Sequence, residues 1–327
     1  MRPVDAHPAR VRVRARLHAS RGLCIALFPL IGSSALGCSF NAVADAADAD
    51  VGQANVQALV TVERADSRES RADVVARVAR ARTGSLDEAS LRLAGLGDDF
   101  PALGTCTLQS GSLGSGTGSA GAFGSRGLEL VDVGQVSLEG PEGLHAPLVA
   151  RQVPDPAGML SGVMYSARIS DPSHASSSPV TLTVRAPGVA GDPESLAFVA
   201  QVTLPKDLAE VRLGGVEPKD FSATVGAPAE LTWQAPQESD DLLVVDLKSA
   251  DRAARCTFAD LGRASLLTPT TSDLLPDATS LTLHRIHREH FRLDRTDSRK
   301  AAEAPRGEIR VDSSRTFVLT RRSRAAL

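Results

Sequence analysis

Residues 229–235 read AELTWQA, and the alternation of apolar and polar side chains in this stretch decides the fold class. Ala229, Leu231 and Trp233 fall on one face of an extended chain, and the polar residues between them fall on the other. A period of two residues is typical of a strand that has one face in a core. The stretch therefore predicts a half-buried β-strand.

The same alternation recurs along most of the chain in short runs that are separated by Gly and Pro. Residues 72–82 fit either a strand or a helix, and we favour a strand because the neighbouring runs are strands. Short strands divided by turns every 8–12 residues predict an all-β fold of the sandwich or barrel type. The other runs are 55–63, 128–133, 135–140, 147–153, 159–169, 179–186, 196–204, 210–215, 242–249, 254–260, 263–268, 280–288, 307–312 and 315–321.

The chain has 327 residues, which is more than one core usually organises, so we expect two domains. We predict a signal peptide at 1–37, a lipidated acidic tether at 38–53, and two β-sandwich-like domains at 54–205 and 206–327. The second domain matches an immunoglobulin-like sandwich in size only, because the paired core cysteines of that family are absent. A Gly/Ser-rich loop at 110–127 interrupts the first domain.

The N-terminus carries the clearest targeting signal. A polar segment with six arginines comes first, and the apolar run GLCIALFPLIGSSALG follows at 22–37. This run is shorter than the roughly 20 apolar residues that a membrane-spanning helix needs. A basic segment followed by a short apolar run and small residues is typical of a secretory signal, so the sequence predicts export.

The run ends in Ala35-Leu36-Gly37-Cys38, which resembles the lipobox of bacterial lipoprotein signals. The resemblance implies cleavage between Gly37 and Cys38 and diacylglycerol on the Cys38 thiol. Ala35 departs from the family pattern, in which a larger aliphatic residue is commoner. Ser39 resembles an outer-membrane sorting signal, so the resemblance implies a lipid-anchored protein of the cell envelope at the outer membrane.

Another reading of the N-terminus stays open. A signal cut after Ala44 or Ala46 would discard Cys38 and leave a soluble secreted β protein. An uncleaved anchor helix fits less well because the apolar run is short.

Two cysteines remain beyond the signal and the lipobox. Cys106 and Cys256 lie 150 residues apart, in different predicted domains. An oxidising compartment permits a disulfide between them, but pairing requires their Cα atoms to lie within about 7 Å. A possible Cys106–Cys256 disulfide and a buried free thiol at Cys256 both remain open.

We find no catalytic, cofactor or metal motif. The G-x-G-x-x-G match at 116–121 lies in Gly/Ser low complexity and lacks the helix that would bind a pyrophosphate. His284, His287 and His290 lie in an alternating run. On a strand, His287 faces away from the other two, which lie roughly 20 Å apart. We therefore predict no cofactor, no metal site and no enzyme activity.

Charge also limits the partners. The chain carries a net charge of −3, and residues 1–37 contribute six Arg and one Asp, so the remainder carries about −8. An acidic body of this kind argues against a nucleic-acid partner. The runs WQAP (233–236), DLLVVDL (241–247) and CTFADLGRASL (256–266) resemble uncharacterised predicted lipoproteins of high-GC Gram-negative bacteria, and this resemblance implies no activity.

We expect a non-catalytic binding or structural role. The partners would be the membrane, through lipid on Cys38, and a protein or glycan. An envelope hydrolase without a recognisable motif and a calcium-dependent adhesion module are the alternatives.

Overall fold

The computed structural model describes residues 56–65, 71–82, 86–97, 100–109, 127–154, 160–174, 179–192, 194–220, 230–236, 240–295 and 305–319. The predicted signal peptide with Gly37, the tether with Cys38, and all of the Gly/Ser loop except Gly127 lie outside these residues. Within the described residues strands are the dominant element and the one α-helix has six residues, so the all-β prediction is confirmed. No helix in this part of the chain has both the length and the apolar character needed to cross a membrane.

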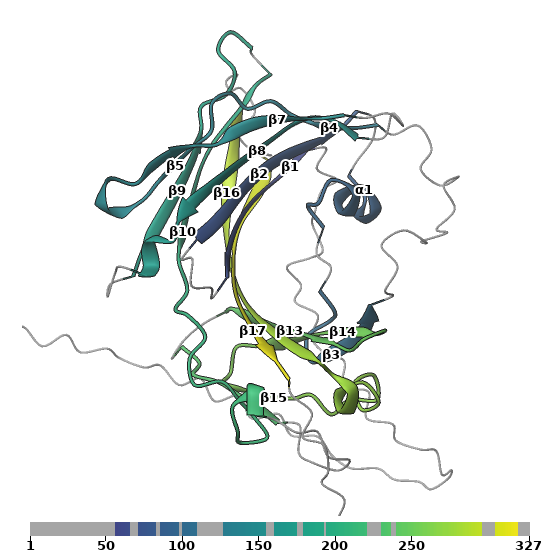
Figure 1. The fold of residues 1–327 in the computed structure, drawn as a ribbon. Coiled ribbons are helices and arrows are strands. Elements are labelled where there is room, and N and C mark those ends of the chain that lie inside the picture. The colour runs from purple at the N-terminus through teal and green to yellow at the C-terminus, as the bar shows by residue number, and fades with distance from the viewer. Residues whose placement is uncertain are drawn as a thin grey trace, which may run out of the picture. The chain divides into compact units, whose positions relative to one another are not determined.

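A sheet that folds over on itself encloses the first core (Figure 1). Its edge strands β6 and β7 are two parts of one stretch, 145–153, which turns at the buried Leu148. Leu148 N donates to Val136 O at 2.9 Å and holds this corner. The strands, in their order across the sheet, are β6 (His145–Pro147), β5 (Ser137–Glu139), β9 (Thr181–Ala186), β10 (Leu196–Thr203), β16 (Ser280–Arg295), β17 (Arg306–Val318), β1 (Val56–Ala65), β2 (Arg71–Ala81), β4 (Leu128–Leu130), β8 (Leu160–Ser170) and β7 (Val149–Val153).

The ambiguous run at 72–82 is strand β2, as predicted. Ala72, Val74, Ala76 and Val78 are all buried in the first core, and the residues between them face the other side of the sheet. The buried residues recur every second position, which is the period of a strand and not that of a helix. The alternation therefore decides between the two readings here.

The second core lies between the same large sheet and a small one. Along the N-terminal half of β16 the sheet continues through β13 (Leu242–Lys248), β14 (Ala253–Ala259) and β3 (Thr105–Gln109). The small sheet has the order β11 (Arg212–Leu213), β12 (Glu230–Thr232) and β15 (Arg263–Ser265). Leu231 and Trp233 are buried in this core, as the alternation in AELTWQA predicts.

Strands β16 and β17 run through both cores. Leu281 and Leu283 of β16 pack in the second core, whereas Phe291 and Leu293 of the same strand pack in the first. Strand β17 pairs in parallel with β1 over eight residues. The division near residue 205 separates most of the residues of the two cores, but the sheet is continuous across it, so two separate domains are not confirmed.

The predicted strands at 307–312 and 315–321 form the single strand β17. No Gly or Pro interrupts Asp312-Ser313-Ser314, and pairing with β16 continues through them. Polar residues that interrupt the apolar alternation therefore do not mark a turn here, because the strand pairing with β16 continues through them.

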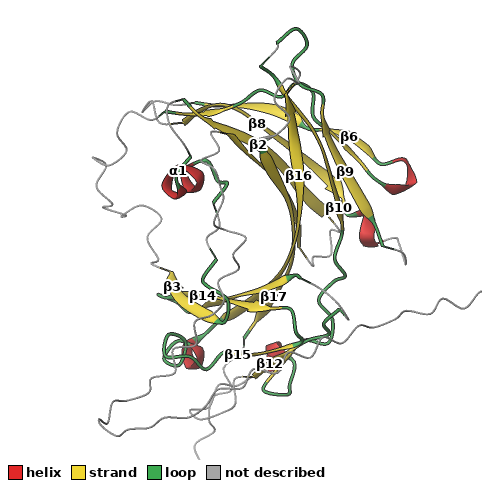
Figure 2. Cartoon of the chain, turned by 180° about the vertical axis from the view of Figure 1, so that it is seen from behind, coloured by secondary structure: helices red, strands yellow, loops and turns green. Residues whose placement is uncertain are grey.

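The other face of the large sheet is concave and carries helix α1 (Glu88–Leu93), as Figures 1 and 2 show. Leu59 and Ala79 on this face pack with Ala94 and Leu96, which follow the helix. Asp87 caps the helix by accepting a hydrogen bond from Ser90 N at 2.8 Å. Neither α1 nor β3 is predicted from the sequence. The short 3-10 turns are Pro141–Gly143, Pro172–His174, Pro218–Asp220 and Leu275–Asp277.

Candidate functional site

Two buried arginines lie side by side on the sheet where the two cores meet. Arg64 of β1 and Arg285 of β16 are each paired in register with Ser313 of the intervening strand β17. Arg64 is 4% exposed and Arg285 is 1% exposed. On β17, Val311 belongs to the first core, and Phe317 packs against the second. The small Ser313 therefore sits at the boundary between the cores, where its side chain leaves room for both guanidinium groups.

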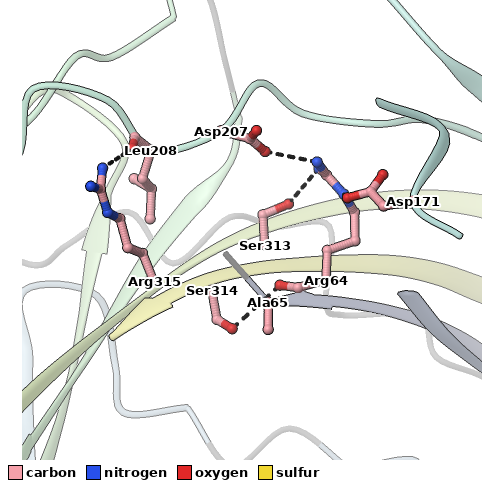
Figure 3. Close-up of a pocket in the computed structure, with 8 residues that line it drawn as sticks. All are labelled: Arg64, Ala65, Asp171, Asp207, Leu208, Ser313, Ser314 and Arg315. Atoms are coloured by element: carbon pink, nitrogen blue, oxygen red, sulfur yellow. Dashed lines mark hydrogen bonds and ion pairs between the residues drawn. The ribbon is translucent and has the colours of Figure 1, made fainter. Parts of the chain in front are cut away.

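Every N–H donor of Arg64 has an acceptor. A guanidinium has five such donors. Nε donates to Asp171 Oδ2 at 2.8 Å. Nη1 donates to Pro205 O at 3.1 Å and to Ser313 Oγ at 2.9 Å. Nη2 donates to Asp207 Oδ1 at 2.7 Å and also to Ser173 Oγ. Figure 3 shows the bonds to Asp207 and Ser313. Arg64 therefore holds the loop after β8, strand β17 and the segment after β10 together, and it has no N–H left for an outside anion.

The ion pair between Arg64 and Asp171 is almost fully withdrawn from water. Burial raises the pKa of Asp171, but hydrogen bonds from Ser173 and from Arg64 outweigh it, so that the pKa lies below its ordinary value. Asp171 is therefore a carboxylate in the folded protein and depends on these donors.

Arg285 holds the same segment from the other side. Its Nη1 donates to Lys206 O at 2.7 Å, and its Nη2 donates to Gln234 O at 2.9 Å. Its Nε lies 2.7 Å from Asp260 Oδ2, which makes an ion pair rather than an aligned hydrogen bond. Asp260 Oδ1 accepts from Trp233 Nε1. Arg285 thus connects the segment after β10, through Asp260, to Trp233 in the second core.

A small pocket opens beside Arg64, and Figure 3 shows its walls. Its volume is about 20 Å³, which is room for about one water molecule. Arg315 Nη1 closes one side by donating to Leu208 O at 3.0 Å. The lining residues are Arg64, Ala65, Asp171, Asp207, Leu208, Ser313, Ser314 and Arg315. A pocket of this size fits a structural junction, not a site for a metabolite.

A row of charged side chains crosses the concave face. His284 of β16 lies between two carboxylates: its Nδ1 is 3.0 Å from both carboxylate oxygens of Asp312, and its Nε2 is 3.5 Å from Asp246 Oδ2. Arg255 of β14 binds Asp246 through two hydrogen bonds of 2.8 and 2.7 Å. The row therefore joins strands β14, β13, β16 and β17 by alternating charges.

The electrostatics of this row favour a charged histidine. Burial lowers the pKa of His284, but hydrogen bonds to Asp246 and Asp312 outweigh it and raise the pKa to about 9. Burial raises the pKa of Asp246, but hydrogen bonds from Arg255 and His284 lower it to about 2. On β1, burial raises the pKa of Glu63, and the negative charges of the neighbouring Asp312 and Asp73 raise it further. At neutral pH His284 is therefore a cation in an ion-pair network, which suits neither a general base nor a metal ligand.

The three histidines of β16 do not gather. His287 faces away from His284, as the alternation predicts, and its Nδ1 lies 2.6 Å from Asp241 Oδ1. Among the described residues, no three His, Cys, Asp or Glu side chains are placed to share a metal ion. The buried Arg64 and Arg285 were not singled out from the sequence. Each stands at a core-facing position of an apolar alternation, after Val60 and Val62 and after Leu281 and Leu283 respectively, and this signal could have found them.

Cys106 and Cys256 form a disulfide in the structure. They lie directly opposite each other on the antiparallel strands β3 and β14. Cys256 is buried, and Cys106 is partly exposed. The strand pairing thus brings together two residues that are 150 apart in the chain.

No model of a known protein family matches the chain, and curated proteins give no match either.

Replacing Arg64 by Met tests the arginine pair. The substitution keeps the apolar stem but leaves the buried Asp171 without its ion-pair partner, so we expect the free energy of unfolding to fall by about 3–5 kcal/mol. Denaturant titration followed by circular dichroism measures this. Arg168→Met is the matched control, because Arg168 pairs with Asp73 in an exposed position, where we expect a loss of about 1 kcal/mol or less. Equal losses in the two variants would contradict the assignment.

The histidine row predicts a pH dependence of stability. The pKa of His284 rises from 6.5 to about 9 on folding, so its stabilising effect is complete below pH 6.5 and is lost as the pH rises through 9. We expect the wild type to exceed His284→Gln in unfolding free energy by up to about 3 kcal/mol at pH 6, and this excess should disappear by pH 10. Urea titrations at several pH values measure it, with the exposed His145→Gln as control. An excess that does not change with pH would contradict the assignment.

Proposed function

We propose that this chain is an exported cell-envelope protein that is anchored by lipid on Cys38 and carries a β body with a binding or structural role rather than a catalytic one. The observation that carries the proposal is the run Ala35-Leu36-Gly37-Cys38 at the end of a short apolar segment that follows six arginines. Each buried CH₂ of an acyl chain contributes about 0.8 kcal/mol, so two or more chains on one residue would hold the protein firmly to a membrane.

The disulfide supports export independently of the lipobox. Disulfides form and persist in oxidising compartments and are rare in the cytosol, where thiols are kept reduced. Cys106 and Cys256 are joined in the folded body, so the body suits the compartment to which the signal would direct it.

The buried charges support a non-catalytic role. All N–H groups of Arg64 donate hydrogen bonds within the protein. Arg285 forms an ion pair with Asp260 and donates to backbone carbonyls. His284 is held as a cation between two carboxylates. Groups used in this way stabilise a scaffold, and a scaffold of strands and loops suits recognition of a protein or glycan at its surface. The acidic body argues against nucleic acid as that partner, and Ser39 favours the outer membrane.

Incorporation of labelled palmitate tests the anchor directly. Cells expressing the wild type and Cys38→Ala are labelled, and the mature proteins are isolated and weighed by mass spectrometry. We expect label in the wild type only, with a mature mass that begins at Cys38.

Cys24→Ala serves as the matched control. Cys24 lies in the predicted signal and is removed with it, so this variant should keep the label. An unlabelled wild type that begins after Ala44 or Ala46 would overturn the proposal and identify a soluble secreted protein instead.

A further inference from the structure

We propose that residues 100–109 form a redox-held strap: the Cys106–Cys256 disulfide fixes this segment across the concave face of the sheet, and reduction by a dithiol releases it. The inference goes beyond the proposed function. It concerns the folded body only and does not depend on the lipid anchor.

The strap is attached to the concave face at two places. At one end, the ring of Phe100 lies 5.2 Å from the guanidinium carbon of Arg288 and 5.4 Å from that of Arg310, which are opposite each other on β16 and β17. At the other end, Gly104 N donates to Thr257 O at 2.7 Å, and β3 pairs with β14. The strap therefore passes from β16 and β17 to β14, and Figure 2 shows β3 beside β14 at the end of this path.

Three side chains of the concave face between these two attachments are buried, and two of them are apolar. Val244 of β13, Ile286 of β16 and Thr257 of β14 are 1%, 2% and 2% exposed. Ile286 lies two residues from Arg288 on the same face, and Val244 is opposite Thr257 in register. In the register of the sheet these three residues lie between the two attachments, so we assign their burial to the strap.

The noncovalent hold on β3 is weak. Within the described residues, β3 pairs with β14 alone, and all of its side chains except that of Cys106 are exposed. A side-chain bond from Thr270 Oγ to Cys106 O, at 3.3 Å, adds one contact at its outer edge. An edge strand of five residues with exposed side chains has little burial to keep it in place. The covalent bond to the buried Cys256 is therefore the main attachment of this end of the strap.

The geometry also favours one route of reduction. Cys106 is partly exposed whereas Cys256 is buried, so the thiolate of a dithiol attacks Cys106 Sγ and displaces the Cys256 thiolate, which takes up a proton. The second thiol of the reductant then attacks its own sulfur in the mixed disulfide and displaces the Cys106 thiolate, which is protonated in turn. In total, two electrons and two protons pass to the protein, and the dithiol becomes a cyclic disulfide.

Hydrogen exchange of the full chain, with and without dithiothreitol in native buffer, tests the strap. We expect the amides of Thr105–Gln109 and those of β14 that face β3 to exchange at least tenfold faster after reduction. Fluorescence of a dye that binds apolar surfaces should rise at least twofold as the side chains of Val244 and Ile286 become accessible. The emission of Trp233 in the second core should stay unchanged.

Two outcomes would overturn the proposal. Equal exchange of β3 in the oxidised and reduced protein would show that the strap is held without the disulfide. Loss of protection throughout both cores, with a shifted Trp233 emission, would show that the disulfide is a general staple and not the attachment of a strap.

Variants connect the effect to these cysteines and separate it from the anchor. Cys106→Ser combined with Cys256→Ser should exchange like the reduced protein and should not respond to dithiothreitol. Cys38→Ala should respond like the wild type, so failure of the lipid anchor and failure of the strap give different results. A response that persists in the double variant would contradict the assignment.

Discussion

The fold depends on two arginines that are buried next to each other at the junction of two apolar cores. Arg64 and Arg285 flank Ser313 on neighbouring strands and hold residues 205–207 from opposite sides. A buried guanidinium is tolerated only when its charge is paired and its N–H groups are bonded, so each arginine requires a particular arrangement of carboxylates and carbonyls around it. Asp171 and Asp260 supply the charges, and the segment that leads from the first core to the second supplies the carbonyls.

The long strands β16 and β17 explain why the junction must be polar. They extend for 16 and 13 residues, which is longer than one core requires, and they carry apolar residues of the first core at one end and of the second core at the other. Between the cores β1, β16 and β17 carry Arg64, Arg285 and Ser313 at buried positions, and these polar side chains bond to the segment at 205–207. On the concave face the same strands carry the row around His284, in which opposite charges on neighbouring strands stabilise the sheet across its width.

The sequence alone predicts the fold class, most strand positions and the buried face of runs such as AELTWQA, because alternation records which side of a strand is buried. It predicts a strand at 72–82 and places His287 on the other face of its strand from His284. It did not identify strand partners, so the parallel pairing of β1 with β17 and the single sheet across both cores were not foreseen. The exposed strand β3 and the six-residue α1 have too little apolar pattern to be recognised. The core-facing positions of Arg64 and Arg285 in an apolar alternation are a signal for burial, but the alternation alone also fits a solvated arginine, and the carboxylates that pair with them are distant in the chain.

The most direct test of the arginine junction is hydrogen exchange of Arg285→Met, followed along β16 and β17. Among the described residues, the partners of Arg285 lie at the junction or on the side of the second core, at Lys206, Asp207, Gln234 and Asp260. If the junction couples the cores, the amides near Val311 in the first core and those near Leu283 in the second should lose protection together. Loss of protection confined to the amides near Leu283 would show that the cores are independent, and it would contradict a fold held by its arginine junction.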